Sequence, residues 1–93
     1  MITAIIIDDE RKGRLEKKEK LTAYCKDVNM IAEAADGFEA ITLIEKLMPR
    51  LIFLDIEMPR MNGFEMLNQL KEKKFQVIFT TAYDQYAIKA IKY

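Results

Sequence analysis

The chain has 93 residues, of which 51% are hydrophobic and 32% charged, a composition typical of one small globular domain and not of a disordered chain. Its 15 basic and 15 acidic side chains cancel, so no general electrostatic attraction to nucleic acid or anionic lipid is expected. It has no histidine and only one cysteine, Cys25, which excludes an internal disulfide, cysteine–histidine metal clusters and cysteine–histidine catalysis.

The first half of the sequence alternates short apolar runs with amphipathic segments. Ile2–Ile7 is almost continuously apolar and rich in β-branched residues, as in a strand buried on both faces. Arg11–Lys26 is predicted to be a helix with a thin apolar stripe made of Leu15, Leu21, Tyr24 and Cys25. Met30–Ala35 is a second strand, followed by a helix that we expect Asp36 to cap together with Glu39 and that ends before Pro49.

The second half continues the alternation. Leu51–Leu54 is a third buried strand that ends at Asp55, and a loop from Glu57 to Gly63 leads into a helix over 64–71. A fourth strand over 77–80 is closed by two small residues, and the pattern after it predicts a last helix from a cap at Asp84 through Ile91. The βαβαβαβα order predicts a mostly parallel sheet with helices on both faces. No membrane-spanning segment is expected, because no apolar run approaches the ~20 residues that a span needs.

Acidic residues follow two of the predicted strands. Asp8 and Asp9 come after the first strand and Asp55 after the third, and these strands are neighbours in a flavodoxin-like order. Three converging carboxylates repel one another unless a cation joins them, and Mg²⁺ suits a shallow site with few oxygen ligands. The alternative is that Asp8 and Asp9 only end a strand and cap a helix, but the third acid makes this explanation weaker. Gly13, Gly37 and Gly63 are too dispersed for a nucleotide-binding loop.

Three sequence segments together resemble the receiver domain of bacterial two-component response regulators. These are IIIDDE, LIFLDIEMPRMNGFEML and VIFTTAYDQYAIKAI. The detailed residue pattern of the first and third segments is similar to that of the LytTR-type subgroup. The resemblance covers residues 1–93 as one receiver domain. It implies a flavodoxin-like (CheY-like) doubly wound parallel sheet of order 2-1-3-4, with the fifth strand and fifth helix of the family missing.

The resemblance also implies roles for individual residues. Asp55 would be the phosphoacceptor, and a Mg²⁺ ion would be held by Asp9 directly, by Asp8 mainly through water, by Asp55 and by the backbone carbonyl of Glu57. The remaining roles are phosphoryl binding and switching by Thr81 with the small Ala82 beside it, modulation of phosphoryl lifetime by Tyr83 and Glu57, and shaping of the loop by Pro59 and Gly63. Met58 and Met61 are expected to be packing residues.

The resemblance implies a cytoplasmic signalling switch, not an enzyme acting on a separate metabolite. A sensor histidine kinase would supply the phosphoryl group, and DNA would be bound only through an output domain outside these residues. The phosphate-contacting lysine of the family has no equivalent in the chain, because Lys89 and Lys92 belong to the predicted last helix. The missing elements would leave the fourth strand an exposed edge, so we expect a homodimer through that edge or the fourth helix as one way to complete the fold.

Two alternatives stay open from the sequence. The chain could be a receiver fragment that keeps the fold but does not switch, since the phosphate-contacting lysine is absent. It could instead be a small Mg²⁺-dependent phosphatase or phosphotransferase with a strand-end aspartate nucleophile. Against the second alternative, the chain is short and carries Asp-x-Glu at Asp55 and Glu57 where such enzymes carry Asp-x-Asp.

Overall fold

The computed structural model of the chain describes residues 1–80 and 89–92. Strands and helices alternate up to the fourth strand, and these elements match the predicted ones to within one or two residues at each end. In chain order the elements are β1 (Ile2–Ile7), α1 (Arg11–Tyr24), β2 (Val28–Ala34), α2 (Gly37–Leu47), β3 (Leu51–Asp55), α3 (Gly63–Gln69), β4 (Gln76–Thr80) and β5 (Lys89–Lys92).

The first four strands lie parallel in the order β2-β1-β3-β4, which confirms the predicted CheY-like sheet. β1 is central and pairs with both β2 and β3. Ile7 at the end of β1 pairs with Leu54 near the end of β3, so the residues that follow these two strands emerge next to each other. This register brings together the acidic residues of the two strand ends.

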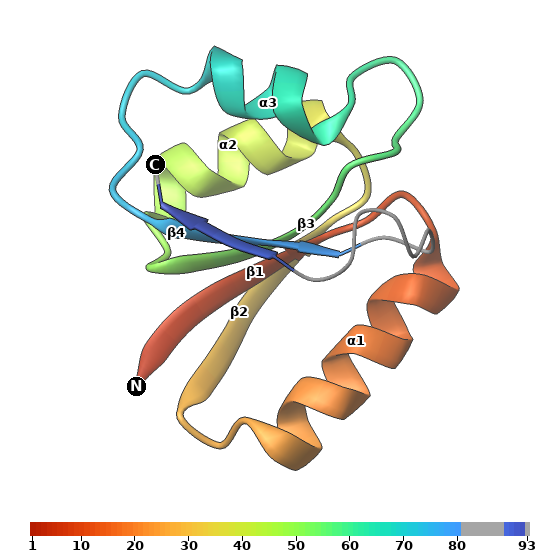
Figure 1. Cartoon of the computed structure of the whole chain (residues 1–93), viewed down its shortest axis with the longest axis vertical. Helices are drawn as coiled ribbons and strands as arrows, with labels where there is room; N and C mark the ends of the chain where they lie inside the picture. The colour runs from red at the N-terminus through yellow and green to blue at the C-terminus, as the bar shows by residue number, and fades with distance from the viewer. Residues whose placement is uncertain (81–88, 93) are drawn as a thin grey trace.

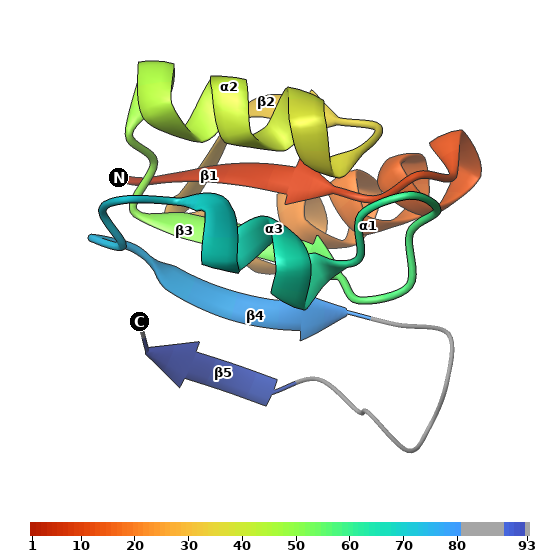
Figure 2. The same cartoon turned by 90° about the horizontal axis from the view of Figure 1, so that it is seen from above.

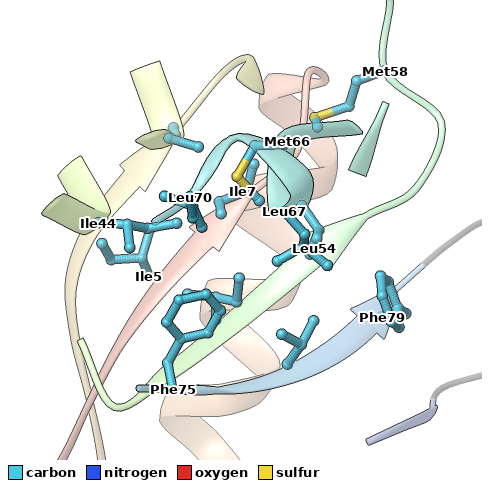
Figure 3. Close-up of a cluster of buried hydrophobic side chains, with 14 of the residues drawn as sticks. Ile5, Ile7, Ile44, Leu54, Met58, Met66, Leu67, Leu70, Phe75 and Phe79 are labelled. Carbon is cyan, nitrogen blue, oxygen red and sulfur yellow. The ribbon is translucent and has the colours of Figure 1, made fainter. Parts of the chain in front are cut away.

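The larger hydrophobic core lies between the sheet and the α2–α3 layer. Helices α2 and α3 cover one face of the sheet and α1 covers the other (Figure 1). Alternate residues of the central strands point toward α2 and α3, among them Ile5, Ile7 and Leu54, and they meet Met66 and Leu67 of α3 (Figure 3). Burial of these side chains on one face is what the period of two in a strand requires.

The face under α1 holds a smaller core, and the predicted apolar stripe of α1 is only partly correct. Leu21 packs against a buried cluster of sheet residues, but Leu15 and Tyr24 are 55% and 85% exposed, and no residue of Arg11–Tyr24 is buried. Polar contacts hold the helix instead: Arg14 Nε lies 3.0 Å from Glu33 Oε1 on β2. The cause is that most of the helix surface is charged, so little apolar area is left to face the sheet.

The end of the chain departs from the prediction. Of the helix expected from Asp84 through Ile91, residues 84–88 lie outside the described residues, and Lys89–Lys92 form β5, which runs antiparallel to β4 (Figure 2). The edge of β4, predicted to be exposed, is therefore paired over Gln76–Phe79. This pairing supplies hydrogen-bond partners for backbone groups of both strands along their shared edge.

Two consequences follow for the other predictions about this region. The β4 edge is not free for a second copy of the chain over the paired residues, so that route to a homodimer is not supported. A parallel fifth strand and a fifth helix, which the resemblance implied to be missing, are not among the described elements. Of the helices in the described ranges, none combines the length and the apolar character that crossing a membrane requires.

Candidate functional site

Three carboxylates meet at the C-terminal edge of the sheet, as predicted. Asp8 and Asp9 follow β1, and Asp55 is the last residue of β3. One carboxylate oxygen from each of the three lies within 4.8 Å of the others. Asp8 is buried, whereas Asp9 and Asp55 are partly exposed. The site is therefore a shallow acidic pocket with a buried floor.

Asp8 is fixed by its neighbours on every side. Its backbone N–H donates to the carbonyl of Ala34 at 3.1 Å, and its own carbonyl accepts from Nη1 of Arg14 at 2.8 Å. Its Oδ1 accepts the backbone N–H of Glu10 at 2.9 Å, and its Oδ2 forms an ion pair with Nζ of Lys17. These contacts hold the side chain of a 4% exposed aspartate in one orientation.

The environment of Asp55 raises the pKa of its carboxyl group from 3.8 to about 6. Burial is the largest cause, and the negative charge of Asp8 is the next. A backbone hydrogen bond from Glu57 to Oδ1, at 3.3 Å, and the positive charge of Lys17 act in the opposite direction. Asp55 is thus a carboxylate whose negative charge is poorly compensated, and a cation at the site would relieve it.

The connection from β3 to α3 passes close to Asp55. The N–H of Gly63 donates to the carbonyl of Ile56 at 2.9 Å, and a Cβ atom at Gly63 would lie 2.9 Å from the carbonyl oxygen of Asp55. Asn62 then caps α3 in a capping box with Glu65. Gly63 therefore permits a close approach of backbone to backbone at this point of the connection.

The two methionines of this connection are packing residues, as predicted. Met58 is 7% exposed and belongs to the larger core, and Met61 packs against that core. Met61 also lies at the start of α2, where a Cβ atom at Gly37 would come within 2.7 Å of its sulfur.

Several of the predicted site residues lie outside the described residues. These are Thr81, Ala82 and Tyr83. Their neighbour Thr80 is described: its Cα pairs with that of Asp55, and its buried hydroxyl group has no hydrogen-bond partner among the described residues. The side chain of Glu57 is exposed next to Asp55, and Pro59 lies in the exposed part of the same connection.

Sequence reasoning missed the cationic side of the site. Lys17 and Arg14, both on α1, contact Asp8 through its side chain and its carbonyl. The role of Gly13 was also missed. A Cβ atom at this position would lie 2.5 Å from Oδ2 of Asp8, so the glycine leaves room for that carboxylate. The available signal was the single glycine in a basic helix that directly follows the acidic pair.

The donor set of the pocket suits a hard divalent cation. Three carboxylates offer oxygen ligands within a small volume, and burial together with the negative charge of Asp8 raises the pKa of Asp55. Mg²⁺ prefers a few carboxylate ligands and keeps several waters, which a shallow and partly exposed site allows. The residues present therefore fit a metal site.

Comparison with known proteins identifies the family. Residues 4–93 match the family model described as the response regulator receiver domain, and the chain belongs to this family. It is accordingly a signalling module of a two-component system, and a cognate histidine kinase is implied. The predicted family is confirmed, and a phosphatase or other enzyme of metabolism is not supported.

Curated relatives extend beyond the matched region. The chain is 42% identical over 93 residues to the transcriptional regulatory protein BtsR of Salmonella typhimurium, and 40% identical to an uncharacterized response regulatory protein of Yersinia pestis. Each match covers 99% of this chain but only 38% and 39% of the relative, so the chain spans about two-fifths of their length. Transcriptional regulators among the relatives agree with the resemblance to the LytTR-type subgroup.

Solved structures show the same fold. The response regulator domain of Thermotoga maritima CheB has a TM-score of 0.81 and 29% identity, over 95% of this chain and 66% of that one. The receiver domain of AraT from Geobacillus stearothermophilus has a TM-score of 0.79 and 30% identity, over 92% of this chain and 68% of that one. The fold is thus shared with receiver domains.

Proposed function

We propose that the chain is a phosphorylation-controlled switch that accepts a phosphoryl group on Asp55 from a sensor histidine kinase. The observation that carries the proposal is the convergence of three carboxylate oxygens within 4.8 Å, with Asp55 at the partly exposed side of the pocket. Asp55 is accessible to an incoming phosphoryl group, whereas Asp8 is buried and already held by its neighbours.

The chemistry is a nucleophilic displacement at phosphorus. An oxygen of Asp55 attacks the phosphohistidine of the kinase; the new O–P bond forms, the N–P bond breaks, and its electron pair stays on the imidazole, which takes up a proton. Asp55 must be ionised for this step, and with a pKa of about 6 it is largely ionised at neutral pH. A bound Mg²⁺ ion would supply charge neutralisation for the phosphoryl oxygens.

The roles of the surrounding residues are part of the proposal. Asp9 would bind the metal directly, Asp8 mainly through water, and Glu57 through its backbone carbonyl. Thr81 would hydrogen-bond the phosphoryl group beside Ala82, while Tyr83 and Glu57 would modulate its lifetime. The support is the close grouping of the three aspartates and the hydrogen bond that keeps Glu57 beside Asp55.

The output of the switch would lie in the remainder of a longer protein. Relatives named as transcriptional regulatory proteins support a DNA-binding output domain beyond the receiver. Phosphorylation would shift the population of receiver conformations and thereby change a surface for dimerisation or for a partner. A cytoplasmic location and the identity of the kinase stay predictions.

The test is phosphorylation by acetyl phosphate with Mg²⁺, read as intact mass. We expect one adduct of about 80 Da, the mass of one phosphoryl group, in the unchanged chain and none in Asp55→Asn. Asp27→Asn is the matched control, because Asp27 is exposed and distant in sequence from the pocket. An unmodified chain would favour the non-switching alternative, and turnover of a small phosphoester would favour a phosphatase.

A further inference from the structure

A cation of the chain itself occupies the acidic pocket. Lys17 projects from α1 and its Nζ forms an ion pair with Oδ2 of Asp8, with side-chain exposures of 23% and 5%. Its charge also reaches Asp55, because it is one of the groups that lower the pKa of that carboxyl. The ammonium group of Lys17 therefore acts on two of the three carboxylates, by direct contact with Asp8 and through its charge on Asp55.

The pairing is built into the backbone around Asp8. Oδ1 of Asp8 is already held by the N–H of Glu10 at 2.9 Å, which directs Oδ2 toward α1. Gly13 makes the space for it, since any Cβ atom there would lie 2.5 Å from Oδ2. Gly13 and Lys17 are four residues apart and so share one face of the helix. Both oxygens of Asp8 are thus occupied without a metal.

We propose that Lys17 is a resident counter-ion of the pocket, which competes with the divalent cation and sets the affinity of the site for it. The inference rests on the proposed function, since it concerns the same metal site. The three ionised aspartates carry a charge of −3, and together with the ammonium group of Lys17 the net charge is −2. A metal ligated through Asp8, directly or through water, must also displace the ammonium group from Oδ2.

The size of the effect follows from Coulomb's law. A single charge and a divalent ion roughly 6 Å apart repel by an amount that corresponds to about a tenfold change in affinity, even with the dielectric constant of water. The partial burial of the Lys17–Asp8 pair makes the repulsion stronger than between exposed groups. Lys17 should therefore weaken Mg²⁺ binding by about tenfold or more.

Calorimetric titration of the chain with Mg²⁺ at constant ionic strength tests this. We expect Lys17→Met to bind Mg²⁺ about tenfold more tightly than the unchanged chain, and Lys17→Arg to bind it with nearly unchanged affinity. Lys18→Met is the matched control: it removes the same charge from the next residue, which is 54% exposed and pairs with Glu33 on β2 at 3.9 Å. Its affinity should change by less than about twofold, as for an exposed and screened charge.

A second measurement uses the unchanged chain and does not depend on how a variant folds. Saturation with Mg²⁺ should shift the side-chain NMR signals of the Lys17 ammonium and its adjacent methylene, while those of Lys18 stay in place. Unshifted Lys17 signals at saturation would show that the ion pair survives metal binding and would overturn the inference.

The outcomes separate the inference from the proposed function. If the unchanged chain binds Mg²⁺ and Lys17→Met binds it equally or more weakly, Lys17 does not compete and instead positions Asp8, so the inference fails while the metal site stands. If neither chain binds Mg²⁺, the inference fails together with the metal-dependent function. If Lys17→Met binds Mg²⁺ more tightly than the unchanged chain and Lys18→Met does not, the inference is supported.

Discussion

Asp55 carries an electrostatic cost in the folded chain. Its pKa is raised from 3.8 to about 6, so the folded chain favours the protonated form and loses stability as the pH rises through this range. Asp55→Asn, which is always neutral, should remove that cost. In EDTA we expect it to raise the free energy of unfolding by about 1–2 kcal/mol near neutral pH, after allowance for solvent screening, and by almost nothing near pH 4.

Urea denaturation of both chains across this pH range measures the effect. Asp27→Asn serves as a control, because it changes the same charge at an exposed position. An Asp55→Asn variant that is less stable at neutral pH, or equally stabilised at both ends of the range, would mean that burial and Asp8 do not act on Asp55 in this way.

The acidic half of the pocket could be predicted from sequence, whereas the basic half could not. Strand ends of a parallel sheet share one edge, so Asp8, Asp9 and Asp55 had to converge once the order of strands was known. The place of Lys17 depends on how α1 lies against the sheet and on the space left by Gly13, which are properties of tertiary packing. From the sequence, the basic run of this helix was better explained as a solvated surface, with docking to a kinase as the alternative.

At the scale of elements, the sequence pattern failed to predict the exposure of α1 and the strand conformation of β5. Leu15 and Tyr24 fall on an apolar stripe but remain exposed, because most of the surface of α1 is charged and little apolar area is left to face the sheet. The segment at Lys89–Lys92 has a helical pattern but pairs with β4. In this second case a tertiary interaction exceeded the weak local preference of a short segment.

The β3–α3 connection allows a sharper prediction at the same scale. Gly63→Ala would place a Cβ atom 2.9 Å from the carbonyl oxygen of Asp55 and 3.1 Å from Cγ of Leu54, and the backbone must move to accommodate it. We expect a loss of about 1–3 kcal/mol in the free energy of unfolding, as for other overpacked sites. Because the strain falls on Asp55, phosphorylation by acetyl phosphate should also slow.

Gly37→Ala is the matched control for this change. Gly37 is likewise the first residue of its helix, but the nearest atom to its added Cβ is the sulfur of Met61 at 2.7 Å, in a flexible side chain that can turn aside. Its stability should fall by less than that of Gly63→Ala in chemical denaturation. Equal losses in the two variants would show that the close approach to Asp55 has no special cost.

For the molecule as a whole, the two faces of the sheet are unequal. The α2–α3 face holds the larger cluster of buried side chains, while the α1 face holds a small cluster and charged contacts (Figure 1). The alternation of apolar runs was sufficient to predict the sheet, since strands buried on both faces differ clearly from amphipathic helices. The stability of the fold also depends on any ligand that binds the strand ends of the native chain.

This dependence gives a prediction for the whole fold. Anything that binds the native state alone raises the free energy of unfolding by mass action, which is about 1.4 kcal/mol at a ligand concentration ten times the dissociation constant. For a domain of this size, Mg²⁺ should therefore raise the Tm by several degrees at neutral pH. The increase should shrink near pH 5, where Asp55 is largely protonated because its pKa is about 6.

Thermal denaturation with Mg²⁺, and with NaCl at equal ionic strength, separates specific binding from screening. A site made of three carboxylates should respond to the divalent ion far beyond the salt, and Asp9→Asn should lose most of that response because it removes one of the three ligands. The exposed Asp27→Asn should keep the full response. If NaCl raises the Tm as much as Mg²⁺ does, the carboxylates are merely screened, and the pocket cannot supply the metal that phosphorylation of Asp55 requires.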